Sequence, residues 1–131
     1  MIENNNIDIR TKINNLGIVV IVPTYNNEKT LKQVIDDIKD YTNNIIVVND
    51  GSTDSTSEIL NQIKDIEVIS YPKNKGKGYA LKQGLLKAKQ LEFKYAVTID
   101  SDGQHYASDI PIFVEEIEQN PDTFLVGARN L

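Results

Sequence analysis

The sequence predicts an α/β fold in which helices cover both faces of a mostly parallel sheet. The first observation is that short β-branched runs alternate along the chain with longer segments of helical period. Such alternation is typical of βαβ units, whose right-handed crossovers make successive strands parallel. The second observation is that the short runs are apolar at nearly every position, as expected of strands with both faces buried.

The expected elements follow a polar lead-in. Residues 1–16 include an asparagine run at positions 4–6 and have little apolar content, so we expect a flexible segment there. The regular pattern begins at Gly17, and we expect residues 17–131 to belong to one domain. Its five strands are predicted at residues 18–22, 45–48, 67–70, 95–99 and 124–126.

Four helices are expected between these strands. Each shows an apolar stripe at the spacing of three or four residues that one helix face requires. A capping-box pattern, Ser55-x-x-Glu58, opens the second helix. The stripes are Leu31, Val34, Ile35 and Ile38; Ile59, Leu60 and Ile63; Ala80, Leu81, Leu85 and Ala88; and Ile110, Phe113, Val114 and Ile117.

The composition narrows the class of protein. With 131 residues, 40% of them hydrophobic and 25% charged, the chain reads as one soluble globular domain. Its net charge of −5 argues against a nucleic-acid partner, and the absence of cysteine excludes disulfides and thiolate metal sites. The longest apolar run, residues 17–22, is far too short to cross a bilayer. The start does not resemble a signal peptide, so we expect a cytoplasmic protein.

The residues that core packing does not explain follow the predicted strands. Ligands of open α/β sheets bind at the carboxyl ends of the strands, so these segments would meet at one edge. Together they bring carboxylates, amides, lysines and an arginine to that edge. The segments are residues 23–28, 49–54, 72–78, 100–105 and 127–129.

Asp100 and Asp102 stand one residue apart, and like charges so close need a cation between them. Mg²⁺ and Mn²⁺ prefer oxygen ligands, although aspartate is also common in turns, so both interpretations stay open. His105 is more often a packed or surface side chain than a ligand.

Two glycine-containing stretches are also ambiguous. Asp50-Gly51-Ser52 is typical of a turn, but a carboxylate there can also accept hydrogen bonds from a ribose or a base. Gly76-Lys77-Gly78 could hold an anion at a helix start. The chain has no P-loop motif, so a P-loop ATPase is excluded.

Four motifs in register resemble the family 2 glycosyltransferases of the GT-A fold. They are "VVIVPTYNNEKTL", "IIVVNDGSTDST", "NKGKGYAL" and "TIDSDGQH". The last motif and the "VGARN" ending are most similar to the polyprenyl-phosphate branch, which includes dolichol-phosphate mannosyltransferase. The resemblance implies a Rossmann-like, nucleotide-binding half of a GT-A domain that transfers a sugar, with inversion, from a nucleotide-diphosphate sugar.

The resemblance also implies roles for single residues. Asp100-Ser101-Asp102 is similar to the DxD motif, whose catalytic acids hold a divalent cation, Mg²⁺ or Mn²⁺, against the donor diphosphate. Asp102 and Gln104 would be the closest metal ligands, with Asp100 near the metal and the ribose. Asn27 and Asn49 depart from the family, which often has acids there. The implied nucleotide-sugar contacts are Pro23, Tyr25, Glu28, Asp50, Lys75, Asp100 and Arg129.

The acceptor is left open. A lipid phosphate, as in the polyprenyl branch, is already an anion and needs no general base, whereas an alcohol needs one. The family's domain runs beyond Leu131, so the chain is expected to be the N-terminal portion of a longer enzyme. An unpaired sheet edge in it would favour a homodimer. The full-length protein could work at the cytoplasmic face of the membrane.

Three alternatives compete with this interpretation. A sugar-phosphate nucleotidyltransferase would have a glycine-rich loop after the first strand, where this chain has "PTYNNEKT". A phosphoacceptor signalling module would have a pair of acids there, where only Glu28 stands. The third alternative, a non-catalytic nucleotide-binding fragment or module, stays open, because this chain alone could bind nucleotide without transferring sugar.

Overall fold

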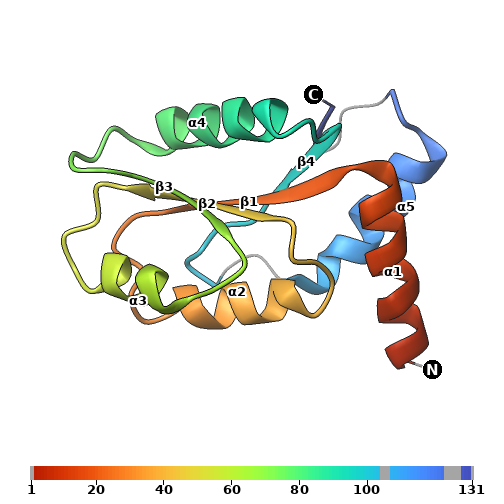
Figure 1. The fold of residues 1–131 in the computed structure, drawn as a ribbon, viewed down its shortest axis with the longest axis horizontal. Helices are drawn as coiled ribbons and strands as arrows, with labels where there is room; N and C mark the ends of the chain where they lie inside the picture. The colour runs from red at the N-terminus through yellow and green to blue at the C-terminus, as the bar shows by residue number, and fades with distance from the viewer. Residues whose placement is uncertain (1, 104–106, 123–127, 131) are drawn as a thin grey trace.

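A five-stranded sheet forms the centre of the protein (Figure 1). The computed structural model describes residues 2–103, 107–122 and 128–130. The strand order is β3-β2-β1-β4-β5, with the first four strands parallel and β5 antiparallel to β4. The predicted mostly parallel sheet is confirmed. The strands are β1 (Ile18–Thr24), β2 (Ile45–Asp50), β3 (Glu67–Tyr71), β4 (Tyr95–Thr98) and β5 (Ala128–Asn130).

Helices cover both faces of the sheet, as the sequence predicts (Figure 1). One face carries α4 alone, and the other carries the remaining helices. A single 3-10 turn, Ala107–Asp109, leads into the last helix. The helices are α1 (Ile2–Leu16), α2 (Leu31–Lys39), α3 (Thr56–Gln62), α4 (Lys77–Gln90) and α5 (Ile110–Gln119).

The expectation of a flexible segment at residues 1–16 is wrong, because α1 occupies it. Ile9, Ile13 and Leu16 recur at helical spacing and pack into the core, with Ile13 fully buried. The Arg10 side chain donates a hydrogen bond of 2.6 Å to the Lys39 carbonyl at the end of α2. This apolar stripe is short and follows the asparagine run, which is why composition alone pointed to a lead-in.

The two layers of the core differ in side-chain size. Branched side chains fill the space between the sheet and α2, α5 and α1. Against α4 the sheet meets the small residues Ala80, Gly84 and Ala88. A Cβ atom on Gly84 would lie 2.6 Å from Cγ2 of Ile21, so α4 lies unusually close to the sheet. This close packing fixes the position of the helix that begins at the candidate site.

Burial varies across the sheet. Every residue of β1 and β2 is buried, as the continuous apolar runs predict. The edge strand β3 is more exposed, and Val68 there is 39% exposed. The strand predicted at residues 124–126 lies outside the described residues, whereas β5 begins at Ala128. None of the described helices is long and apolar enough to cross a membrane.

Candidate functional site

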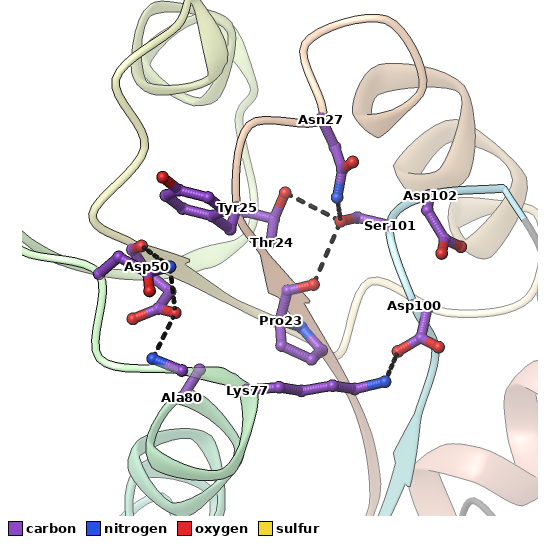
Figure 2. Close-up of a pocket in the computed structure, with 12 residues that line it drawn as sticks. Pro23, Thr24, Tyr25, Asn27, Asp50, Lys77, Ala80, Asp100, Ser101 and Asp102 are labelled. Atoms are coloured by element: carbon purple, nitrogen blue, oxygen red, sulfur yellow. Dashed lines mark hydrogen bonds and ion pairs between the residues drawn. The ribbon is translucent and has the colours of Figure 1, made fainter.

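A cavity of about 270 Å³ opens at the carboxyl ends of β1, β2 and β4, beside the start of α4 (Figure 2). It lies at the edge of the sheet where the sequence places the polar segments. Five of the predicted site residues line it, from three different strand ends. The lining residues are Pro23, Thr24, Tyr25, Asn27, Asp50, Asn74, Gly76, Lys77, Ala80, Asp100, Ser101 and Asp102.

One side of the cavity, residues 100–102, is here called the acidic wall. Its middle residue, Ser101, is 1% exposed and fixes the wall in place. The Ser101 hydroxyl lies 3.2 Å from the Pro23 carbonyl oxygen and 2.9 Å from the Thr24 hydroxyl, and it accepts a hydrogen bond from the Asn27 amide (Figure 2).

These three contacts use the full capacity of a hydroxyl, which has one hydrogen and two lone pairs. The Thr30 hydroxyl also donates to the Ser101 carbonyl oxygen. The buried serine therefore ties the acidic wall to the end of β1 and the loop after it. The two aspartates beside Ser101 line the cavity, with Asp100 half-buried and Asp102 exposed.

The opposite side, residues 74–77, is here called the glycine-rich wall. It is held by Asp50, which is 3% exposed at the end of β2. One oxygen of the Asp50 carboxylate accepts a 2.8 Å hydrogen bond from the backbone N–H of Lys75. The other accepts bonds of 3.0 Å from the Gly76 N–H and from the Asn74 side-chain amide. A buried carboxylate is stabilised by such donors, so Asp50 organises the loop before α4.

Gly51 allows the glycine-rich wall to lie this close to β2. Its φ is +68°, in the region that favours glycine, and a Cβ atom there would lie 2.2 Å from the Asn74 nitrogen. Tyr71, at the end of β3, lies near the same carboxylate. Burial raises the pKa of the Tyr71 phenol, and the negative charge of Asp50 raises it further.

The positive charge that the structure places beside Asp100 is the side chain of Lys77, which the sequence interpretation did not assign; the expected divalent cation remains a proposal. Its ammonium lies 2.6 Å from a carboxylate oxygen of Asp100. Figure 2 shows the Lys77 side chain extending below Pro23, from the start of α4 to the acidic wall. The two walls of the cavity are thus joined by an ion pair.

Two predicted contacts do not line the cavity. The Glu28 carboxylate instead accepts a 3.0 Å hydrogen bond from the Ser55 N–H. The Lys75 ammonium lies 4.8 Å from the ring centroid of Tyr79, a cation–π contact. Gln104 and His105 lie outside the described residues, and of Arg129 the structure describes only its backbone place in β5.

Glu28 belongs to a clip that joins the loop after β1 to the loop after β2. Asn26, at a positive φ of 52°, accepts hydrogen bonds from the backbone N–H groups of Thr53 and Asp54. Asp54 in turn accepts from the Glu28 and Thr56 N–H groups. Burial raises the pKa of Asp54, but hydrogen bonds with Thr56 and Glu28 outweigh it, so the pKa lies below its ordinary value.

The sequence interpretation missed several residues of the cavity. Lys77 was noted only as part of a glycine-rich stretch, and Ser101 only as the middle of an acidic motif. Their importance depends on contacts between segments far apart in the chain, such as the 77 positions that separate Ser101 from Thr24. A signal was present for Lys77, since it is the only basic residue flanked by glycines at a predicted helix start.

The acidic wall has a donor set that fits a divalent cation. Asp100 and Asp102 offer carboxylate oxygens, the ligands that Mg²⁺ and Mn²⁺ prefer. Within the described residues, no group of three or more acids or histidines gathers as a complete protein-only site. Mg²⁺ typically takes one or two carboxylates and completes its shell with substrate phosphates and water. The arrangement therefore suits a cation that is shared with a phosphate ligand.

Comparison with known sequences identifies the family. The pattern of the family described as Glycosyl transferase family 2 matches residues 19–131. The chain belongs to this family. The resemblance found in the four motifs is therefore confirmed, and with it the glycosyltransferase fold.

Two curated relatives are named for transfer to dolichyl phosphate. The UDP-N-acetylglucosamine–dolichyl-phosphate N-acetylglucosaminyltransferase of Methanococcus voltae is 34% identical, with 86% of this chain and 51% of the relative covered. The dolichyl-phosphate beta-glucosyltransferase of Dictyostelium discoideum is 29% identical, with 99% and 43% covered. The chain thus spans about half the length of the curated relatives that it matches.

Solved structures agree with this assignment. Glucosyl-3-phosphoglycerate synthase from Mycobacterium tuberculosis, crystallised with Mn²⁺, UDP and phosphoglyceric acid, is 28% identical with a TM-score of 0.65. The match covers 86% of this chain and 42% of the synthase. TarS of S. aureus is 26% identical with a TM-score of 0.63, covering 79% of this chain and 33% of TarS.

Proposed function

We propose that the protein transfers a sugar from a uridine-diphosphate sugar to a polyprenyl phosphate of the dolichyl-phosphate kind, with a divalent cation. The observation that carries the proposal is the cavity between the two walls, with paired carboxylates on one side and a loop organised by a buried aspartate on the other. The UDP and Mn²⁺ of the related synthase support the donor and the cation. The names of the curated relatives support the acceptor.

The donor would lie across the cavity, with its nucleoside toward Pro23, Tyr25 and Asp50. Tyr25 is 44% exposed, so its ring is available to pack against a base. Asp50 would have two tasks, since it lines the cavity and also holds the backbone of residues 75 and 76. Glu28 and Lys75 would act less directly than the sequence implies, through the clip and through Tyr79.

Asp100 and Asp102 would hold the divalent cation, with Gln104 as the further ligand that the family resemblance implies. A divalent cation bound there would supply positive charge to neutralise and orient the leaving diphosphate. The chain's own residues shape this site. Ser101, which stands between the two aspartates, ties this segment to the end of β1. We propose Arg129 as a further phosphate contact.

Transfer would proceed by direct displacement with inversion. An oxygen of the lipid phosphate forms the new bond to the anomeric carbon, while the bond from that carbon to the diphosphate breaks and UDP leaves with the electron pair. The acceptor oxygen is already deprotonated, so no general base is required.

The proposal extends to the whole protein. Residues 17–131 would be the N-terminal part of a GT-A domain whose remainder supplies the acceptor site. A dolichyl-type acceptor would place the enzyme at the cytoplasmic face of a membrane. The exposed edge strand β3 could pair two copies, which light scattering at high protein concentration would test, since a monomer would contradict it.

A transfer assay tests the proposed function. The protein is incubated with radiolabelled UDP-glucose or UDP-N-acetylglucosamine, dolichyl phosphate and Mn²⁺, and label in the lipid fraction is counted. We expect transfer that requires Mn²⁺ and is lost in Asp102→Ala but retained in Asp36→Ala, whose carboxylate makes only a surface pair with Lys32. Metal-dependent UDP binding without transfer to any acceptor would instead support a non-catalytic nucleotide-binding module.

A further inference from the structure

We infer that Lys77 is a donor-binding residue that changes partners: its ammonium pairs with Asp100, and it contacts the diphosphate once a divalent cation takes its place on that carboxylate. This inference rests on the proposed function. Its starting point is the 2.6 Å ion pair between the Lys77 ammonium and Asp100. The pair joins the two walls across the place where the diphosphate would lie (Figure 2).

The position of Lys77 is built by the fold. Lys77 is the first residue of α4, directly after the two N–H groups that Asp50 holds. The close approach of Gly84 to Ile21 fixes the rest of that helix against the sheet. The backbone of Lys77 is therefore held from both sides, while its side chain is 67% exposed and able to change rotamer.

The charges of the cavity explain why Lys77 is needed there. Three of the lining residues, Asp50, Asp100 and Asp102, are acidic, and Lys77 is the only basic residue among those that line the described cavity. An anionic diphosphate entering beside two carboxylates would be repelled. Lys77 lowers that repulsion before a cation is present, because its ammonium lies 2.6 Å from the Asp100 carboxylate and offsets that negative charge.

A divalent cation bound to Asp100 would turn the attraction that Lys77 feels at this position into repulsion. The ammonium would then face a like charge at close range and lose its carboxylate partner. Exposed ion pairs contribute little to stability, so the displacement is easy. A lysine side chain is a flexible carrier of a point charge and a common phosphate ligand, and the diphosphate is the anion within its reach.

This exchange predicts a definite coupling. Lys77 competes with the cation for Asp100 when no nucleotide is present, and it strengthens nucleotide binding when the cation is bound. Nucleotide would therefore help the cation to bind, since it gives the displaced ammonium a new partner. By thermodynamic reciprocity, the cation would help the nucleotide by the same factor.

The test compares Lys77→Met with the wild-type protein in two separate titrations. Mn²⁺ alone is titrated and free Mn²⁺ is measured by electron paramagnetic resonance, and UDP is titrated by calorimetry in saturating Mn²⁺. In Lys77→Met we expect the dissociation constant for Mn²⁺ alone to fall about two- to fivefold. We expect the constant for UDP with Mn²⁺ to rise about tenfold.

Two further variants serve as controls. Lys82→Met removes the same charge from an exposed position of α4 outside the cavity and should change neither constant. Lys77→Arg keeps the charge and should hold UDP nearly as well as lysine does. Together they separate the effect of this ammonium from that of net charge or helix stability.

Different results would overturn the role of Lys77 and the proposed function. If Lys77→Met binds Mn²⁺ alone no more tightly than wild type, or binds UDP equally well, the inference about Lys77 is overturned while the proposed function stands. If the wild-type protein binds no UDP in the presence of Mn²⁺, the proposed function is overturned, and the inference falls with it.

Discussion

The two walls of the cavity are held in position by different kinds of polar side chain. Each is a loop whose ligand-facing residues stand next to a buried polar side chain at a strand end. The acidic wall is fixed by a neutral hydroxyl, Ser101, whose partners are a carbonyl, a hydroxyl and an amide. The glycine-rich wall is fixed by a carboxylate, Asp50, that collects three N–H donors.

The difference follows from what each wall has to present. The acidic wall already carries two carboxylates, so a third charge buried among them would add repulsion. The glycine-rich wall presents a lysine, Lys77, and its backbone N–H groups at residues 75 and 76 bond to the buried negative charge of Asp50. Hydrogen bonds to a charged acceptor are stronger than neutral ones, so the glycine-rich wall should be the more sensitive of the two to substitution.

The largest effect is expected from Gly51→Ala. The new Cβ would overlap the backbone of residues 73 and 74 and would require a strained positive φ. We expect a loss of about 3 kcal/mol or more in the free energy of unfolding, measured by urea denaturation, because strain and overlap add. Gly78→Ala is the matched control, because nothing lies within 4 Å of a Cβ there and alanine favours a helix, so it should be neutral or stabilising. Equal destabilisation by both changes would contradict the close approach.

The next largest loss of stability is expected from Asp50→Asn. The substitution removes the charge and replaces one acceptor oxygen with an amide that faces N–H donors. A loss of about 2–3 kcal/mol is expected in the same denaturation experiment. Nucleotide binding should also weaken, because the backbone that carries Lys77 would be loosened. A variant with unchanged stability would show that the loop is held by other contacts.

Ser101→Ala tests the acidic wall in the same way, because it removes the uncharged hydroxyl that fixes this wall. The Thr24 hydroxyl and the Asn27 amide would lose a buried partner, at a cost of about 1–2 kcal/mol. Mn²⁺ affinity should fall as well, since the two aspartates would be less well positioned. If Ser101→Ala proves more destabilising than Asp50→Asn, the proposed contrast between the walls is wrong.

The smallest change in stability is expected from Asp54→Asn, in the clip that joins the loops after β1 and β2. The pKa of Asp54 in the folded protein lies below the ordinary value of 3.8. The stability that it contributes is therefore present above that value and is lost as the pH falls through the lower folded pKa. Asp54→Asn should be slightly less stable than wild type at pH 7, and thermal melts should show the difference shrinking below about pH 4. A difference that stays constant with pH would exclude the carboxylate as its cause.

Much of the fold could be predicted from periodicity. The apolar runs of β1 and β2 and the stripe of α2 are long and regular, so their burial follows from the sequence. The helix α1 could not be recognised, because Ile13 is buried only through contacts with distant elements. Composition near a terminus says little about such contacts.

The candidate site could be predicted in part. The strand-end rule brought Pro23, Tyr25, Asp50, Asp100 and Asp102 to one cavity, and they line it. Lys75 and Lys77 stand two residues apart, and the glycines on either side of Lys77 do not by themselves show which lysine reaches the cavity. What separates them is the helical start at residue 77, which directs one side chain to Asp100 and leaves the other on Tyr79.

The measurement that tests the central claim most directly is thermal unfolding of the protein with UDP, with GDP and without nucleotide, each with and without Mn²⁺. Ligand at about 100 times its dissociation constant stabilises the folded state by about 2.7 kcal/mol. For a domain of this size the midpoint should rise by about 3–6 °C. The account predicts this rise with UDP and Mn²⁺ together and its loss in Asp102→Ala. An unchanged midpoint with UDP and Mn²⁺, or a rise that persists in Asp102→Ala, would contradict it.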